Sequence, residues 1–322
     1  MARVALFSHP ACLLHDTGPG HSDSRFRLPA LFAAVDGDAE LPPFLDRRRP
    51  TPATEQDLLR AHAPAHVASV KGAVDEARRS GGLVWLDHYT PASAGSWEAA
   101  LAAAGCAIAA AEAVLDGEAP TAFALARPPG HHATSDRAMG FCLFNNVAVA
   151  VRNLQARGRV ERVLVLDWDA HHGNGTQEIF YGDPSVYVLS LHLADDYPGS
   201  GAPAERGDGA GRGTTRNVPL PRGTTAEEYR RRCAEALEAA LAEFTPELIV
   251  VSAGFDLLAG DPEGGLALEP RDLHALTADL LERAGRAPVV GVLEGGYAVE
   301  RIGAGLVNVL RAMAGAGAVD PG

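Results

Sequence analysis

The sequence predicts a single α/β domain with a mostly parallel central sheet flanked by helices on both faces. Short, continuously apolar segments alternate with longer segments whose apolar residues recur at helical spacing. Strands that are apolar along their whole length are typical of parallel sheets covered on both faces. Because no internal repeat or Pro/Ser-rich linker interrupts the chain, we expect one domain over 1–314 and a frayed tail over 315–322.

The expected elements alternate along the chain. A first strand is predicted at 3–7 (RVALF), and an Ala-rich helix at 97–115 would have Ser96 as its N-cap. Further strands are predicted at 121–125, 163–166, 186–191, 248–252 and 289–293. Further helices are predicted at 145–156, 226–243, 273–284 and 302–314. The glycine-rich segment 199–213 is expected to be a long surface loop.

Composition limits the classes of function. With 322 residues, of which 47% are hydrophobic, the chain can bury a sizeable core. A net charge of −13 argues against nucleic acid or an anionic membrane surface as a direct partner, and it is compatible with a cationic substrate. The four cysteines are scattered, which indicates buried thiols in a reducing compartment rather than disulfides.

The sequence shows no targeting or membrane signal. The N-terminal apolar run is too short for a signal peptide. The Ala-rich run 99–113 is interrupted by Gly105 and Glu112, so we expect it not to span a membrane. These features predict a cytoplasmic protein.

Polar, titratable side chains follow five of the predicted strands. In open parallel sheets, ligands bind at the carboxyl ends of the strands, so this alignment predicts a functional site there. The residues are Asp167, Asp169, His171, His192, Asp256, Tyr297, His131 and His132.

A metal site is the first chemistry that this edge indicates. Asp169 and His171 are spaced D-x-H, so both side chains can reach one cation, and Asp256 from another strand could add a third ligand. Two carboxylates and one imidazole suit Zn²⁺ with positions left open for water and substrate. Such a metal lowers the pKa of bound water and polarises a carbonyl group.

Acid–base groups accompany the predicted metal site. His131 and His132 could serve as general base and general acid near neutral pH. Tyr297, beside Gly295 and Gly296, could donate a hydrogen bond to a developing oxyanion.

Each of these features has an ordinary structural explanation when taken alone. The D-x-H pair could be polar loop residues, and Asp256 could be an N-cap or a loop carboxylate. Tyr297 could be a turn residue that packs on a helix, and the His pair could be polar surface residues. Together they fill every role that metal-assisted hydrolysis requires, which favours a catalytic site. We assign no role to four further histidines and expect them at the surface or partly packed: His21, His62, His66 and His274.

Six motifs, in this order and spacing, resemble those of the zinc-dependent histone deacetylase family. They are RPPGHHA (127–133), GFCLFNN (140–146), LDWDAHHGNG (166–175), LSLH (189–192), SAGFD (252–256) and LEGGY (293–297). The resemblance extends from HDTGPGH (15–21) to the last helix. DWD, HHGNG and LEGGY are similar to the class II-like branch, which includes bacterial amidohydrolases and acetylpolyamine amidohydrolases.

The resemblance implies a role for each residue of the predicted site. Zn²⁺ would be bound by Asp169, His171 and Asp256. His132 would be the general base and acid, with His131 and Asp167 as its electrostatic partners, and Tyr297 would bind the carbonyl oxygen. Asn174, where class I members carry an aspartate, would give His132 a neutral partner.

The resemblance also implies a substrate channel and a second cation. Gly140 and Phe141 would line a narrow channel for the acylated amine, with Tyr197 contributing. A structural K⁺ would be bound by Asp167, Asp169, His171, Ser190 and Leu191. A second K⁺ site near Phe180, Asp183 and Val186 is left open.

The substrate is the least determined feature. Acetyl-lysine in proteins or peptides is the substrate that the resemblance implies first. Glu263, in AGDPEGG, stands at the channel-mouth position of the gatekeeper glutamate of polyamine deacetylases, where it could attract a distal ammonium group. It could equally be an exposed loop carboxylate. Longer acyl groups, and an oligomer formed through the loops 15–25 and 193–216, also remain open.

Three other hypotheses compete with a deacetylase. Arginase-like ureohydrolases share the D-A-H motif, but their second metal needs aspartates where this chain has Gly173 and Leu258. We therefore reject the ureohydrolase hypothesis. A deacetylase-like binding protein without catalysis is disfavoured because every catalytic residue is present. A metabolite-binding α/β protein would leave the joint motif set unexplained.

Overall fold

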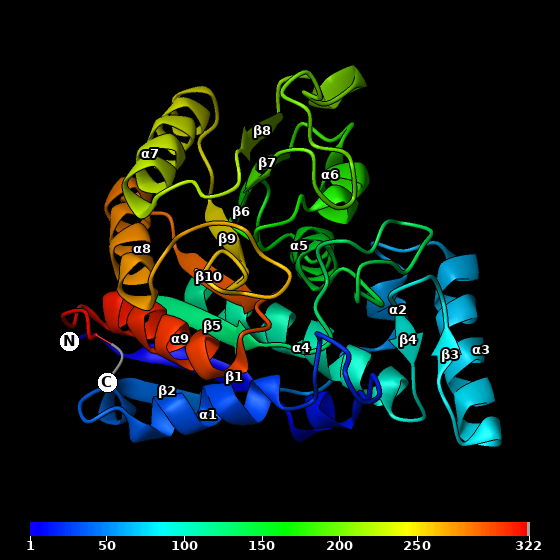
Figure 1. Ribbon diagram of the computed structural model, residues 1–322. Helices are drawn as coiled ribbons and strands as arrows, with labels where there is room; N and C mark the ends of the chain where they lie inside the picture. Colours follow the sequence, from blue (N-terminus) through cyan, green and yellow to red (C-terminus); the bar gives the residue numbers. More distant parts are fainter. Residues whose placement is uncertain (321–322) are drawn as a thin grey trace.

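The computed structural model, described here for residues 1–320, has a central eight-stranded sheet (Figure 1). The strand order is β2-β1-β5-β10-β9-β6-β7-β8, and every neighbouring pair is parallel. The strands are β1 (Val4–Ser8), β2 (Leu45–Arg48), β5 (Thr121–Leu125), β6 (Val163–Asp167), β7 (Val186–Leu193), β8 (Thr215–Leu220), β9 (Leu248–Ala253) and β10 (Val289–Leu293). A separate two-stranded antiparallel sheet is formed by β3 (Val84–Trp85) and β4 (Pro91–Ala92).

Helices cover both faces of this sheet, which confirms the predicted fold class (Figure 1). One layer contains α1 (Arg27–Gly37), α7 (Ala226–Glu243), α8 (Pro270–Ala284) and α9 (Val299–Ala314). The other contains α4 (Ser96–Leu115), α5 (Asn146–Ala156) and α6 (Asn174–Phe180). The remaining helices are α2 (Glu55–Leu58) and α3 (Pro64–Ser80). Parallel strands require such crossover helices, and their apolar faces bury the sheet.

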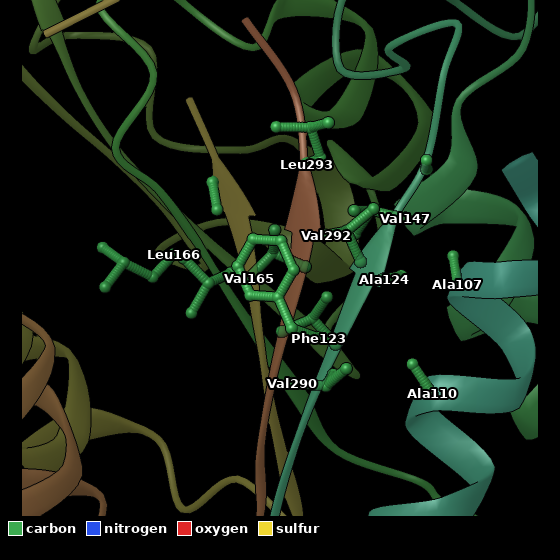
Figure 2. Packing of buried hydrophobic residues seen from close by; sticks show 14 of the residues in the cluster. Ala107, Ala110, Phe123, Ala124, Val147, Val165, Leu166, Val290, Val292 and Leu293 are labelled. Atoms are coloured by element: carbon green, nitrogen blue, oxygen red, sulfur yellow. The ribbon is translucent and has the colours of Figure 1, made fainter. Parts of the chain in front are cut away.

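The hydrophobic core lies on both faces of the central sheet, under α4 and α5 on one face and under α1, α7, α8 and α9 on the other, and part of it is drawn in Figure 2. The strand register places Val290 of β10 and Val165 of β6 on one face of the sheet and Phe123 of β5 on the other, where its ring lies over Gly291. Ala107 of α4 faces the sheet (Figure 2). All four side chains are buried. Alanines let α4 approach the strands closely, so the ends of these strands are held at fixed positions.

The predicted elements are present, with shifted ends and several omissions. Ser96 is the first residue of α4, and its side chain accepts the N–H of Ser93 instead of capping the helix. The helices α1 and α3 were not predicted, although α3 has Pro64 at its start and Gly81 after its end, two ordinary helix-boundary signals. Strand β8 was missed because, as an edge strand with Pro219, it lacks an apolar run.

The chain's long apolar helix and its C-terminal end both pack against the rest of the fold. By length and composition helix α4 could cross a membrane, but 72% of its most apolar window is buried inside the fold, as in the core helix of a globular domain. The described part of the tail is hydrogen-bonded to α9. Asn308 of α9 exchanges two hydrogen bonds with Val319, and Arg311 donates to the carbonyl of Gly317. These side chains bind the backbone groups of Gly317 and Val319 and so hold the tail against α9. Residues 321–322 lie outside the described range.

Candidate active site

The five strands with polar residues at their carboxyl ends are neighbours in the sheet, in the order β5-β10-β9-β6-β7. The chain runs from β5 to β6 and leaves a gap that β9 and β10 fill later. Such a reversal of strand order creates a crevice at the carboxyl edge. Residues up to 166 positions apart in the sequence, from His131 to Tyr297, are thereby collected in one place.

Asp169, His171 and Asp256 form the group that could hold a metal ion. Their ligand atoms lie within 4.8 Å of one another, with His171 Nδ1 at 3.0 Å from Asp256 Oδ2 and 3.3 Å from Asp169 Oδ1. Backbone amides orient both carboxylates: Gly295 donates to Asp169 Oδ2 and Ala170 donates to Asp256 Oδ1, each over 2.8 Å. The side chains are therefore preorganised around one point.

The donor set fits a divalent cation. Both aspartates are fully buried, and burial together with the neighbouring Asp169 carboxylate raises the pKa of Asp256 to about 7. Two buried carboxylates at this distance repel each other unless a cation or a proton compensates them. One imidazole and two carboxylates make the Zn²⁺ ligand set of a catalytic site, which keeps positions for water and substrate.

His131 and Asp167 form a buried pair behind the metal-binding group. His131 Nδ1 donates to Asp167 Oδ2 over 3.0 Å, and both side chains are almost fully inaccessible. Burial opposes a charge on the ring, but the Asp169 and Asp167 carboxylates outweigh it and raise the pKa of His131 to about 10. The two carboxylates thus favour the imidazolium form of His131, and Asp167 holds its ring in place.

His132 has a different environment, although its ring centroid is only 4.0 Å from that of His131. Its Nδ1 donates to Asn174 Oδ1 over 2.8 Å, which leaves the lone pair on Nε2. Burial lowers the pKa of His132 well below its usual value, and the charge of His131 adds to this effect. His132 is therefore a neutral imidazole that can accept a proton at Nε2, and it lines the cavity.

The Tyr297 hydroxyl points toward the metal-binding carboxylates. A Cβ atom on Gly295 would lie 2.6 Å from both Asp169 Oδ2 and Asp256 Oδ2, and 3.1 Å from Tyr297 Oη. Gly295 therefore permits the close approach of these groups, and a larger residue there would displace them. The hydroxyl is placed to donate to an oxygen held at the metal-binding group.

A cavity of about 280 Å³ leads from the surface to these groups. His132, His171 and Tyr297 are at its buried end, and Gly140, Phe141 and Tyr197 form its walls. The Phe141 ring is edge-on to Tyr297, and Tyr197 is edge-on to His132 with centroids 5.0 Å apart. Phe141 has φ +70°, a strained backbone conformation of the kind that concentrates at functional sites. The predicted wall residues are thus at the cavity.

The mouth of the cavity carries both signs of charge. Glu263 and Arg222 line it together with Asp196. The Glu263 carboxylate accepts a hydrogen bond from Ser22 of the loop 15–25. Arg222 donates to the Gly264 carbonyl over 2.9 Å and pairs with Asp196. Glu263 therefore lies at the cavity entrance, and Arg222, which sequence reasoning missed, is a second charged residue there.

Several other buried polar residues were missed. Glu294 accepts the backbone amides of Gly130 and His131, which holds the His pair against β10. As a charged residue directly after an apolar strand, Glu294 had a recognisable signal. His62 and His66 are buried rather than superficial, because they bond the backbone of the segment 134–145 that precedes α5.

The family profile of the histone deacetylase domain matches residues 21–313 of this chain. The chain belongs to the histone deacetylase family.

Relatives in this family include a histone deacetylase-like amidohydrolase of Pseudomonas aeruginosa, which is 42% identical over 92% of this chain and 82% of its own length. A probable deacetylase of Archaeoglobus fulgidus is 40% identical, covering 91% of this chain and 80% of its own. The crystal structure of the HDA15 HD domain superposes with a TM-score of 0.91 at 33% identity, covering 99% of this chain and 90% of that one. These similarities confirm the deacetylase resemblance and the fold.

The site also disfavours a second metal of the ureohydrolase type. A Cβ atom on Gly173 would lie 2.1 Å from Asp167 Oδ2, so this position has no room for the extra aspartate. Leu258 is a fully buried apolar residue. Within residues 1–320, Asp169, His171 and Asp256 are the one side-chain group close enough to hold a metal ion.

Proposed function

We propose that this protein is a zinc-dependent deacetylase that hydrolyses the acetyl amide of a primary amine carried on a flexible alkyl chain. The observation that carries the proposal is the convergence of three groups at the buried end of one cavity. They are the metal-binding group, the neutral imidazole of His132 and the hydroxyl of Tyr297. The family of deacetylases and amidohydrolases to which the chain belongs supports it.

Asp169, His171 and Asp256 would hold the Zn²⁺ ion. When bound, zinc supplies a Lewis acid that polarises the amide carbonyl and makes water a better nucleophile at neutral pH. The mutual proximity of the ligand atoms and the repulsion between the buried carboxylates support this occupant.

The protein's own groups supply the proton transfers. His132 Nε2 accepts a proton from the attacking water, and the Tyr297 hydroxyl donates a hydrogen bond to the carbonyl oxygen as negative charge develops on it. His132 then delivers the proton to the leaving nitrogen as the C–N bond breaks. The products are acetate and the free amine. Burial, and after it the charge of His131, lowers the pKa of His132, so its imidazole is neutral before the reaction and ready to act as a base.

A structural K⁺ ion is a further part of the proposal, at Asp167, Asp169, His171, Ser190 and Leu191. Asp167 and Ser190 are paired across neighbouring strands, and both aspartates are fully buried. Such crowding of oxygen ligands and negative charge supports a monovalent cation behind the catalytic metal. We further propose that the protein acts in the cytoplasm, which its four free, buried thiols support.

Two substrate classes fit the cavity, an acetyl-lysine side chain and an acetylpolyamine. Acetyl-lysine is the class that the family suggests, and a cavity of about 280 Å³ with Phe141 and Tyr197 in its walls could take its unbranched alkyl chain. The polyamine class is favoured by one specific observation, the Glu263 carboxylate at the mouth, where it could pair with a distal ammonium group.

A side-by-side assay of the zinc-loaded protein tests both levels of the proposal. It compares an acetyl-lysine peptide with N8-acetylspermidine and acetylputrescine, with and without a hydroxamate chelator. Hydroxamate-sensitive release of acetate supports the deacetylase activity, and no hydrolysis of any substrate contradicts it. A preference for polyamines that is lost in Glu263→Leu, but kept in the exposed control Glu227→Leu, assigns the polyamine class. A preference for the peptide assigns the lysine class.

A further inference from the structure

We propose that Asp261 is a positioning residue whose single buried carboxylate fixes both Tyr297 at the inner end of the cavity and Glu263 at its mouth. The inference rests on the proposed function, because it assigns Asp261 a part in the same reaction. Asp261 neither lines the cavity nor belongs to the metal-binding group, so it would act through other residues.

The hydrogen bonds of the Asp261 side chain are all to backbone amides at or beside the site. Its Oδ2 accepts the N–H groups of Tyr297 and Ala298 over 2.6 and 2.9 Å, and its Oδ1 accepts the N–H of Glu263 over 3.0 Å. The residue is 8% exposed. Hydrogen bonds to a charged acceptor are stronger than neutral ones, and more so away from water. One side chain thus joins the segment 261–264 to the segment 294–298.

The segment that carries Tyr297 has no helix or strand structure of its own and depends on such contacts. The Gly295 amide donates to Asp169 Oδ2, and the Gly296 carbonyl accepts Arg27 Nε over 2.6 Å. These contacts hold the segment before Tyr297, while Asp261 holds the amide of Tyr297 itself. A donor to a developing oxyanion is effective only if it is held within a fraction of an ångström.

The other side of Asp261 holds the cavity mouth. The amide of Glu263 is bound to Asp261 Oδ1, and the Gly264 amide donates to the Asp261 carbonyl over 3.2 Å. A Cβ atom on Gly264 would lie 2.0 Å from the carbonyl oxygen of Asp256. This segment therefore lies directly on the backbone of a predicted metal ligand, and the positions of Asp256, Glu263 and Tyr297 are coupled through it.

A purely structural role is the alternative, because Ala298 immediately precedes α9. Asp38 offers a matched control for that role. It also accepts two backbone amides, those of Glu40 and Leu41, and its side chain is 7% exposed and pairs with Arg311. Unlike Tyr297 and Glu263, which Asp261 holds, none of these partners lines the cavity. Asp38→Ala should lower stability without changing kcat.

The test compares Asp261→Ala, Asp261→Asn and Asp38→Ala in the zinc-loaded protein. Asp261→Ala should lower kcat about 10²-fold at unchanged zinc content, the size expected when a catalytic group is displaced by about 1 Å. The asparagine oxygen can still accept hydrogen bonds from the Tyr297 and Ala298 amides, so the kcat of Asp261→Asn should be at least about tenfold higher than that of Asp261→Ala. In a Tyr297→Phe background, Asp261→Ala should cost less than about threefold, because both changes act on one group.

The proposal is overturned if the losses of Asp261→Ala and Tyr297→Phe multiply, or if Asp261→Ala lowers only the melting temperature, as Asp38→Ala does. A second measurement separates this outcome from failure of the proposed function. Amide hydrogen exchange in a peptide covering 294–299 should be faster in Asp261→Ala and unchanged in Asp38→Ala, whether or not the protein hydrolyses an amide. Unchanged exchange in Asp261→Ala contradicts the positioning role directly.

Discussion

Two cavities of very different size and chemistry lie at opposite ends of the strands of the central sheet. The hollow at the amino ends of β5 and β10 has a volume of about 780 Å³, against about 280 Å³ for the cavity at the carboxyl ends. The larger one is lined mainly by apolar residues, with Glu247 and Arg286 as its charged side chains. The smaller one ends at His132, His171 and Tyr297. Size alone therefore does not indicate function; convergent polar groups with shifted pKa values do.

The physical basis of this difference is the direction of the strands. In a parallel sheet every strand delivers the loop after it to the same edge, and crossover helices return the chain to the other. Here the carboxyl edge holds fully buried aspartates, a His pair and the strained Phe141. Four predictions test whether function is confined to that edge, in order of decreasing effect.

The largest effect is expected from removing a metal ligand. Asp256→Ala should abolish bound zinc and lower kcat/KM by at least about 10³-fold, more than the loss of a single oxyanion donor. Metal analysis of the purified variant together with the amide hydrolysis assay checks this. A variant that keeps one zinc per chain and wild-type activity would exclude Asp256 as a ligand.

Tyr297→Phe should lower kcat by about 10²–10³-fold while zinc stays bound, since only the hydroxyl donor is lost. The aromatic contact with Phe141 is retained in this variant, so the walls of the cavity should not change. Steady-state kinetics at saturating substrate measures the effect. Near wild-type turnover with bound zinc would show that the hydroxyl does not stabilise the oxyanion.

Asn174→Asp should change the pH dependence more than the maximal rate. A carboxylate beside His132 Nδ1 favours the imidazolium and so raises the pKa of His132. His132 must be neutral to accept a proton. As the pH is lowered, the variant should therefore lose activity at a higher pH than the wild type does. We expect the acidic limb of the kcat/KM profile to move up by about one pH unit. A profile that does not move would mean that His132 is not the titrating base.

The smallest effect is expected at the opposite edge. Arg286 lines the larger hollow and is exposed, so Arg286→Ala should leave kcat/KM within about twofold and stability within about 0.5 kcal/mol. Chemical denaturation and the same hydrolysis assay measure both. A tenfold loss of activity in this variant would contradict the assignment of function to the carboxyl edge alone.

Much of the site could be predicted from the sequence because its motifs are contiguous. Asp169 and His171 lie shortly after the apolar strand β6, and His131 and His132 follow β5 after a short loop. One continuous stretch of sequence therefore shows both the strand and the polar residues that follow it. Asp261 and Arg222 could not be found in this way. Their roles depend on partners far along the chain, such as Tyr297 and Asp196, that no local pattern indicates.

Errors in the predicted fold have similar causes. Strand β8 has mixed polar and apolar residues, and its burial depends on what it packs against. The segment 315–322 was expected to fray, but within its described part Asn308 and Arg311 bind the backbone of Val319 and Gly317. Hydrogen-bond partners supplied by tertiary structure decided its conformation.

The sequence by itself determined the fold class, the candidate metal-binding residues and the family, since these depend on apolar periodicity and on short motifs at strand ends. Only the tertiary structure decided that β5, β10, β9, β6 and β7 are adjacent. It also decided that the pKa of His131 is raised and that of His132 lowered, and that one carboxylate, Asp261, joins the mouth of the cavity to its inner end. The physical reason is that pKa values and orientation depend on burial and on neighbours in space, which strand order and packing bring together.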